Sequence, residues 1–296
     1  MQNSGLGNAI NPLVSIADPR VYSIPMILLI GWRGAPNTND EPQHLTKGRI
    51  TKSLLNLLKI KHCEINSSKD LNKINKLINY SKKKNTVSAI LIKKNQLSET
   101  RKKDKKKQFN LLRSEFIKVL LETIKSDDLI ISTTGYTSRE LYQIRKDNRN
   151  NLGKDFYMVG GMGHTLSTSI GIASNTNQRI ICLDGDGSLL MHLGSLNLIN
   201  YLKPKNLKHI VFNNNAHESV GGQETYFDLI DLKKLSLSFG YKNFNILKSK
   251  KNLKKEIRKI LKKKGPSFIE IRIDNGSIKN LSRPQSLKQV KENFIN

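Results

Sequence analysis

The segment Gly185-Asp186-Gly187-Ser188 follows an apolar run, residues 179–183, that has the composition of a buried strand. A second apolar run, residues 209–212, leads into Asn213-Asn214-Asn215. We predict a strand for each run and, between them, a helix that begins at Ser188. Parallel strands end at the same edge of a sheet. Asp186 and Asn214 are therefore expected to lie close together.

These residue types suit a metal-bound diphosphate. Asp186 and Asn214 each offer a hard oxygen ligand to Mg²⁺, and a nearby backbone carbonyl offers a third. Gly185 and Gly187 let the backbone approach phosphate oxygens, and free N–H groups at a helix start favour negative charge. An ordinary acidic turn between a strand and a helix is the alternative. Order and spacing favour the diphosphate site.

The composition is that of a globular protein with a full core. The chain has 296 residues, of which 37% are hydrophobic. Cys63 and Cys182 are too few for a disulfide framework, so we expect a reducing, cytoplasmic setting. The sequence contains neither an apolar run of membrane-spanning length nor a signal-peptide pattern at Met1. We therefore expect no membrane partner.

The formal net charge of +27 raises nucleic-acid binding as a hypothesis. The excess is mostly lysine, concentrated in residues 81–84, 101–107 and 248–264. Few aromatic or arginine side chains are interleaved with these runs for base stacking or base readout. We interpret the lysines as solvated faces and expect no nucleic-acid partner. A surface that binds polyanions is the alternative.

Along the chain, apolar strand patterns alternate with helical ones. This alternation predicts an α/β fold with a parallel sheet covered on both faces, and ligands bound beyond the carboxyl ends of the strands. We expect helices near residues 9–17, 48–58, 111–124, 139–144 and 165–173 and one ending near 263, and further strands at 25–30, 88–92, 128–132, 244–247 and 267–273.

Several longer segments closely resemble the phosphonopyruvate decarboxylases, a family of thiamine diphosphate enzymes of phosphonate biosynthesis. Sulfopyruvate decarboxylases share similar features. The resemblance implies a Mg²⁺-dependent carboxy-lyase that converts 3-phosphonopyruvate into phosphonoacetaldehyde and CO₂. Sulfopyruvate decarboxylation is the first alternative, and a basic nucleic-acid-binding protein is a more distant one. The matching segments are NSGLGNAINPLVS, IPMILLIGWRGAPNTNDEPQH, STTGYTSREL, DFYMVGGMGHTLS, CLDGDGSLLMHLGSL and FNNNAHESVGGQET.

The resemblance also implies a domain organisation. Residues 1–96 would be the C-terminal part of a pyrimidine-binding domain, residues 97–108 a basic linker, and residues 109–296 a complete diphosphate-binding domain. Cofactor sites in this superfamily lie between these two domain types from different subunits. A homo-oligomer with shared active sites is therefore implied.

The resemblance assigns most of the cofactor site. Asp186, Asn214 and the carbonyl of Ala216 would hold Mg²⁺. Met162 either wedges the cofactor into a bent conformation or packs in the core, and His164 either faces the diphosphate or caps the helix that it precedes. The expected cofactor-binding residues are Thr134, Gly135, Gly161, Met162, His164, Gly185, Asp186, Gly187, Ser188 and Asn214.

Four further residues are expected on the substrate side: Arg33, Gln43, His44 and His217. Gln43-His44 falls where related decarboxylases carry a histidine pair, and His44 would donate a proton to the reacting carbon. Arg33 offers a planar fork for a phosphonate or a carboxylate. His217 would border the substrate pocket. The alternatives are a surface role for His44 and a structural role for Arg33.

One feature of the family has no counterpart in this sequence. Relatives carry a glutamate that hydrogen-bonds the aminopyrimidine ring of the cofactor, whereas Met1-Gln2-Asn3-Ser4-Gly5 corresponds to an internal strand and loop. We therefore expect a shortened pyrimidine-binding domain with exposed sheet edges. Three explanations are open for the missing glutamate. The sequence is a fragment or begins at an internal start, a separate subunit supplies the glutamate, or the chain is a non-catalytic remnant. We expect the chain alone to be poorly active.

Overall fold

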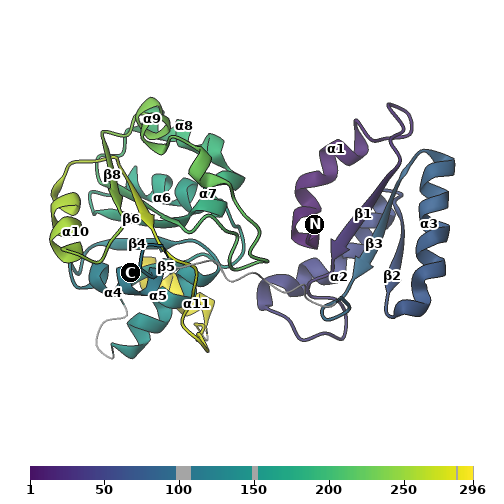
Figure 1. Ribbon diagram of the computed structural model, residues 1–296, viewed down its shortest axis with the longest axis horizontal. Helices are drawn as coiled ribbons and strands as arrows, with labels where there is room; N and C mark the ends of the chain where they lie inside the picture. The colour runs from purple at the N-terminus through teal and green to yellow at the C-terminus, as the bar shows by residue number, and fades with distance from the viewer. Residues whose placement is uncertain (98–107, 149–152, 285, 296) are drawn as a thin grey trace. The chain divides into compact units, whose positions relative to one another are not determined.

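A computed structural model describes residues 1–97, 108–148, 153–284 and 286–295. The chain divides into two compact units, Met1–Lys103 and Asp104–Asn296, and each has its own parallel sheet with flanking helices (Figure 1). The predicted α/β class is therefore confirmed. The predicted linker, residues 97–108, lies almost entirely outside the described residues.

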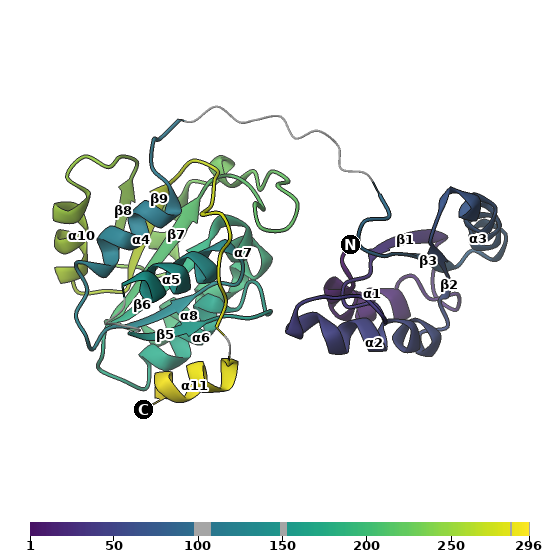
Figure 2. The ribbon, with the colours of Figure 1, turned by 90° about the horizontal axis from the view of Figure 1, so that it is seen from below.

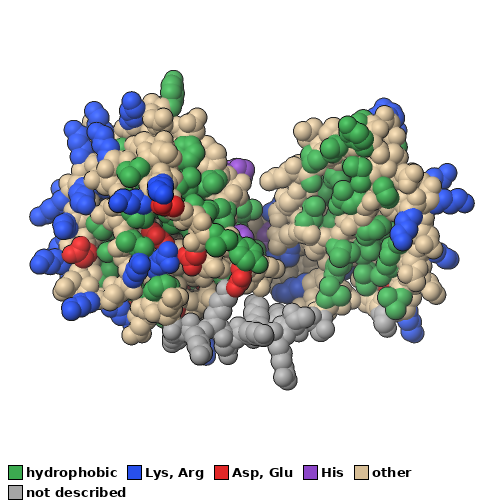
Figure 3. All heavy atoms as spheres, turned by 45° about the horizontal axis from the view of Figure 1, so that its top comes forward, with side chains coloured by type: hydrophobic (Ala, Val, Ile, Leu, Met, Phe, Trp, Pro, Cys, Tyr) green, Lys and Arg blue, Asp and Glu red, His purple; other side chains and the backbone are tan. Residues whose placement is uncertain are grey.

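The first unit has a parallel sheet of three strands in the order β1-β3-β2. Its central strand β3 is buried, whereas β1 at the edge alternates, with Leu28 and Ile30 buried and Leu29 55% exposed. Figure 3 shows hydrophobic side chains gathered on one face of this unit. The elements are β1 (Met26–Gly31), β2 (Lys61–Ile65), β3 (Val87–Ile92), α1 (Ile10–Val14), α2 (Pro42–Leu57), α3 (Leu71–Lys84) and 3₁₀ turns at Asn3–Gly5, Gly7–Ala9 and Ser68–Asp70.

The second unit has a parallel sheet of six strands in the order β5-β4-β6-β7-β9-β8 (Figure 2). The strand order reverses between β4 and β6, because the chain passes from β4 outward to β5 and then returns to β6 on the other side. Such a switch point leaves a crevice at the carboxyl ends of the strands. The strands are β4 (Leu129–Ser132), β5 (Lys154–Tyr157), β6 (Ile180–Gly185), β7 (Leu207–Asn213), β8 (Asn243–Leu247) and β9 (Ser267–Arg272).

Alternate side chains of this sheet enter two separate cores. Ile130 and Ile181 pack with α4, α5 and α10 on one face, and Leu129 and Ile180 pack with α6 to α9 on the other. The helices are α4 (Arg113–Leu121), α5 (Tyr136–Asp147), α6 (Thr165–Ala173), α7 (Asp186–Met191), α8 (Asn197–Leu202), α9 (Leu232–Ser238), α10 (Leu253–Lys262) and α11 (Leu287–Ile295), with 3₁₀ turns at Leu193–Leu196 and Phe227–Leu229.

Two predicted helix starts were wrong. The helix expected from residue 48 begins at Pro42, because proline is well suited to the first helical position. The helix expected from Ser188 begins at Asp186, with Gly185 as its N-cap. The sequence analysis also missed β2, β5, α3, α8, α9 and α11. Among the described residues, no helix is both long and apolar enough to cross a membrane.

Candidate active site

The ends of three neighbouring strands, β4, β6 and β7, surround a small cavity of about 60 Å³ in the second unit. Most of the predicted cofactor residues line it, as the strand order requires. Gly135, Gly161 and His164 are the predicted residues of this unit that do not line it. The predicted residues that do are Thr134, Met162, Gly185, Asp186, Gly187, Ser188, Asn214, Ala216 and His217.

Asp186 places a buried carboxylate at this cavity. Its side chain accepts hydrogen bonds from neutral donors: Thr225 Oγ1 at 2.8 Å, Gly187 N at 2.8 Å and Ala216 N at 3.1 Å. Burial raises the pKa of Asp186 to about 6, and the hydrogen bonds oppose that rise. A carboxylate in this setting favours a bound cation. Thr225, which the sequence analysis missed, holds it in place.

Asn214 presents its side-chain oxygen to the same point. Its Oδ1 lies 3.3 Å from Ala216 N, the group that also donates to Asp186. Its Nδ2 donates to Glu218 Oε2 at 3.0 Å, which fixes the orientation of the amide. The predicted carboxylate and amide ligands therefore converge, and this set of hard oxygen donors fits Mg²⁺.

Two glycines of the site are in close contact with the segment 216–222. A Cβ atom on Gly187 would lie 2.3 Å from His217 Nδ1. A Cβ atom on Gly135, whose φ is +105°, would lie 2.7 Å from Ser219 Oγ. The positive φ favours glycine at position 135, whereas a Cβ atom at position 187 would displace the His217 ring. His217 and Ser219 of this segment also line the cavity.

The hydroxyl of Ser188 joins separate parts of the site. It lies 2.9 Å from Thr133 Oγ1 at the end of β4 and accepts a hydrogen bond from Gly163 N at 3.2 Å. Gly163 has a φ of +91°, a conformation that glycine adopts without strain. Ser188 therefore ties the glycine turn before α6 to the β4 loop.

The sequence left two roles open for each of Met162 and His164, which lie in the glycine turn before α6. Met162 lines the cavity. His164 is the N-cap residue of α6, where its backbone carbonyl accepts a hydrogen bond from Thr168 N at 3.0 Å and its side chain makes no cap hydrogen bond. Its ring instead lies 4.2 Å, between ring centroids, from that of His192.

A partly buried ionic network, which the sequence analysis missed, holds the loop that follows β7. Arg113 Nη2 contacts Glu218 Oε2 at 2.5 Å, and Arg113 Nη1 lies 3.4 Å from Glu140 Oε2. Glu218 Oε1 accepts a hydrogen bond from Gly276 N at 2.6 Å. Burial raises the pKa of Glu140, and Arg113 opposes that rise. Since Arg113 and Glu218 are 105 residues apart, no local pattern predicts their contact.

In the first unit, Arg33 and His44 meet at one carboxylate, Asp40. Arg33 donates from Nε at 2.7 Å and from Nη2 at 2.5 Å, and His44 Nδ1 lies 2.8 Å from Asp40 Oδ1. Gly34 N donates to Asp40 at 2.8 Å. The Arg33 guanidinium holds the pKa of Asp40 well below its usual range. Gln43 lies beside His44 on α2.

Asp40 was not singled out in the sequence, although it stands four residues before His44 and within the DEPQH segment. With Asp40 accepting, His44 Nδ1 carries the proton and His44 Nε2 remains for other partners. The planar fork of Arg33 is largely used within its own unit.

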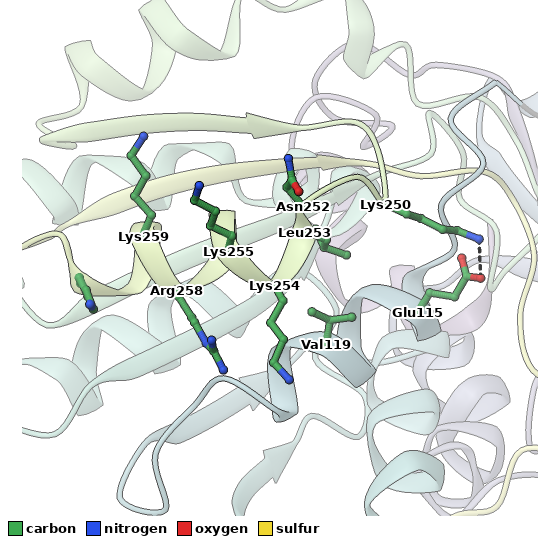
Figure 4. Close-up of a pocket in the computed structure, with 10 residues that line it drawn as sticks. Glu115, Val119, Lys250, Asn252, Leu253, Lys254, Lys255, Arg258 and Lys259 are labelled. Atoms are coloured by element: carbon green, nitrogen blue, oxygen red, sulfur yellow. Dashed lines mark hydrogen bonds and ion pairs between the residues drawn. The ribbon is translucent and has the colours of Figure 1, made fainter.

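Part of the predicted lysine-rich surface lines a separate cavity of about 870 Å³ on α10 and α4 (Figure 4). Lys250 and Lys254 contact Glu115 and Glu122, each at 2.7 Å. None of the residues that line this cavity also lines the one at Asp186. The basic surface is thus distinct from the candidate active site.

A family model described as "Thiamine pyrophosphate enzyme, C-terminal TPP binding domain" matches residues 133–271. Phosphonopyruvate decarboxylase of Streptomyces viridochromogenes is 33% identical over 96% of this chain and 74% of its own length. This chain belongs to the phosphonopyruvate decarboxylase family. The protein of that name from Streptomyces hygroscopicus is 31% identical over the same shares of the two chains. The family resemblance predicted from the sequence is confirmed, and its members are thiamine diphosphate-dependent decarboxylases.

Sulfopyruvate decarboxylases are also similar to this chain. The beta subunit from Methanococcus maripaludis is 32% identical over 63% of this chain and 97% of its own length. The sulfopyruvate decarboxylase of Methanosarcina acetivorans is 27% identical over 99% of this chain and 80% of its own length.

Proposed function

We propose that this chain decarboxylates 3-phosphonopyruvate to phosphonoacetaldehyde and CO₂ with thiamine diphosphate and Mg²⁺. The observation that carries the proposal is the convergence of Asp186 and Asn214 on Ala216 N, at the carboxyl ends of β6 and β7. The substrate comes from the names of the two Streptomyces relatives. We further propose that residues 109–296 are the diphosphate-binding domain and residues 1–96 part of a pyrimidine-binding domain.

In this proposal the second unit binds the charged end of the cofactor. Asp186, Asn214 and the Ala216 carbonyl would hold Mg²⁺. The bound cofactor supplies a sink for the electron pair released when the carboxyl carbon departs. Thr134, Gly135, Gly187 and Ser188 would contact the diphosphate, with Gly161, Met162, His164 and Gly185 beside them.

The proposed substrate-side groups are Arg33, Gln43, His44 and His217. The proton that the product needs would come from Nε2 of the doubly protonated His44 ring, and the Nδ1 contact with Asp40 fixes the plane of that ring. Arg33 Nη1, which does not contact Asp40, would face the substrate anion. His217 and Gln43 would border the bound substrate.

A binding experiment and an activity experiment test the proposal together. We expect thiamine diphosphate to bind the full chain only when Mg²⁺ is present, and Asp186→Ala to abolish that binding, as measured by isothermal titration calorimetry. Release of phosphonoacetaldehyde is followed through an aldehyde reductase. Binding of thiamine diphosphate that is indifferent to Mg²⁺ and to Asp186 would contradict the proposal.

Sulfopyruvate decarboxylation is the second candidate, favoured by the similarity to whole-length and beta-subunit sulfopyruvate decarboxylases. The two substrates differ only in the terminal anionic group. The ratio of kcat/KM for phosphonopyruvate to that for sulfopyruvate decides between them. A ratio above one supports the first proposal.

We propose a cytoplasmic enzyme, which agrees with the free thiols of Cys63 and Cys182. We also propose a homo-oligomer with shared active sites, or a complex in which a separate subunit supplies the pyrimidine-side glutamate. Light scattering of the purified chain gives its mass. Addition of a sulfopyruvate decarboxylase alpha-type subunit, which this chain also resembles over 60 residues, tests the second case through activity.

A further inference from the structure

A second group of potential metal ligands lies inside the second unit. Cys182 and Asp184 are on β6, and His209 is on β7, directly opposite Cys182 in the sheet register. Residues two apart on a strand share a face, so all three side chains lie on the side of the sheet covered by α6. All three are completely buried. Their ligand atoms lie within 4.8 Å of one another.

Within the part of the chain that the structure describes, two polar atoms of this group make no hydrogen bond. Asp184 Oδ2 and His209 Nε2 are both fully buried and unpartnered, and they lie 3.5 Å apart. A buried polar atom without a partner costs about 1–3 kcal/mol, and more when it is charged. The proposed function uses neither atom. The two atoms lie close together but too far apart for a normal hydrogen bond.

The other side of each potential ligand is already bonded. His209 Nδ1 lies 2.7 Å from Tyr241 Oη, and Asp184 Oδ1 accepts a hydrogen bond from Gly185 N at 2.9 Å. The Ser169 hydroxyl hydrogen-bonds the Cys182 thiol. Outer partners of this kind orient metal ligands in proteins, and a metal-bound histidine usually donates its other N–H to an oxygen. The three ligand atoms are thus held toward one another.

We propose that Cys182, Asp184 and His209 supply three ligands to a Zn²⁺ ion, which leaves one tetrahedral position for a further ligand. One sulfur, one nitrogen and one oxygen ligand match zinc and exclude Mg²⁺, which prefers oxygen. Ligand atoms of a tetrahedral zinc site lie about 3.3–3.8 Å apart. The 3.5 Å between Asp184 Oδ2 and His209 Nε2 meets this requirement, and the thiol has to move inward by about 1 Å.

Charge balance supports the same ion. A thiolate, a carboxylate and a neutral imidazole carry two negative charges, which Zn²⁺ cancels within the apolar core. Zinc binding releases the thiol proton to solvent. Because the site is buried, the ion enters as the unit folds. It would join β6 to β7 next to the turn that carries Asp186.

The first test measures the metal on the unaltered, untagged full chain purified with Mg²⁺ and thiamine diphosphate and without chelators. We expect about one zinc per chain by inductively coupled plasma mass spectrometry. X-ray absorption at the zinc edge should show a sulfur ligand at about 2.3 Å. A chain free of zinc after growth in zinc-supplemented medium overturns the proposal. Asp184 and His209 would then be a buried carboxylate–imidazole pair without a metal.

The second test uses cobalt as a coloured substitute for zinc. Cobalt bound to a thiolate gives a charge-transfer band in the near ultraviolet, which should disappear in Cys182→Ser. The matched control is Cys63→Ser, since the chain has only 2 cysteines and Cys63 lies in the first unit. The band should persist in this control.

Two outcomes of the cobalt test overturn the proposal. One is a band that survives Cys182→Ser, and the other is bound cobalt without any thiolate band. The second outcome would place the metal elsewhere, for example at the neighbouring rings of His164 and His192. If Cys182→Ser fails to fold, the X-ray absorption measurement on the unaltered chain still shows whether the bound ion has a sulfur ligand. Loss of the zinc site and failure of the proposed decarboxylation are separate results, because the metal readouts need no substrate.

Discussion

Asp40 in the first unit and Asp186 in the second are both buried carboxylates, yet their surroundings differ. Asp40 contacts Arg33, His44 and the Gly34 N–H, and its pKa lies well below the usual range. Asp186 receives hydrogen bonds mainly from neutral donors such as Thr225 Oγ1, and its pKa is raised to about 6. The charge of Asp40 is balanced within its own unit. The hydrogen-bond donors to Asp186 in the described residues are neutral groups, so they do not balance its charge.

This difference has a thermodynamic consequence. A ligand that binds only the folded state stabilises it by about 2.7 kcal/mol at one hundred times its dissociation constant. Mg²⁺ and cofactor should therefore stabilise the second unit and leave the first unit's Asp40 cluster unchanged.

The largest expected effect comes from removing the unbalanced charge. Asp186→Asn should weaken Mg²⁺-dependent thiamine diphosphate binding by about 100-fold or more, since loss of even an outer partner of a metal ligand costs about 10–100-fold. Calorimetric titration measures the change. Asp231→Asn is the control, because Asp231 is exposed and caps α9, a role that asparagine also fills. Equal binding by both variants would show that Asp186 is not a metal ligand.

The next effect tests whether the balanced cluster also has a catalytic role. His44→Gln should lower kcat by about 100-fold, the usual value of a positioned general acid, while the cofactor dissociation constant stays the same. Steady-state kinetics with phosphonopyruvate measure both. His62→Gln, a substitution in β2 of the same unit, should leave kcat unchanged. An unchanged kcat in His44→Gln would make the cluster purely structural.

A smaller effect is expected on the stability of the first unit. Asp40→Asn leaves Arg33 without its charged partner and should lower the free energy of unfolding by about 1–3 kcal/mol. The fluorescence of Trp32 in urea reports this, because the chain has 1 tryptophan and Trp32 is buried in the first unit. Asp18→Asn is the matched control, since it removes an exposed Asp–Arg pair of the same kind. It should not change the unfolding transition.

The smallest effect is a difference in pH dependence. The folded pKa of Asp186 is raised, so the folded state without metal binds more protons between about pH 4 and 6, and the stability from this group falls as pH rises. Binding of Mn²⁺ without cofactor should therefore be about tenfold weaker at pH 5 than at pH 7. Asp40 has a lowered pKa and should show the opposite sign, with stability lost as pH falls below about 4. Metal binding that does not change between pH 5 and 7 would contradict the raised pKa of Asp186.

The sequence predicted the elements with strong local patterns. Helix α6 has the expected bounds, because its small and apolar residues form an unbroken helical run. The elements it missed have weak patterns: α3 buries only Leu77 and Ser81 among many lysines, and β2 is a polar edge strand. Short or polar elements such as these are stabilised mainly by packing against neighbours.

For the site, the sequence by itself predicted that Gly185-Asp186-Gly187 and Asn214 lie at neighbouring strand ends, because glycines and polar residues that follow apolar strands are encoded locally. Only the tertiary structure decided their supports. The contacts of Thr225 with Asp186, of Arg113 with Glu218 and of Asp184 with His209 join distant parts of the chain. Strand order and register create these contacts, and both depend on how the whole sheet packs. Local sequence selects residue types, whereas burial and long-range pairing set their charge and their partners.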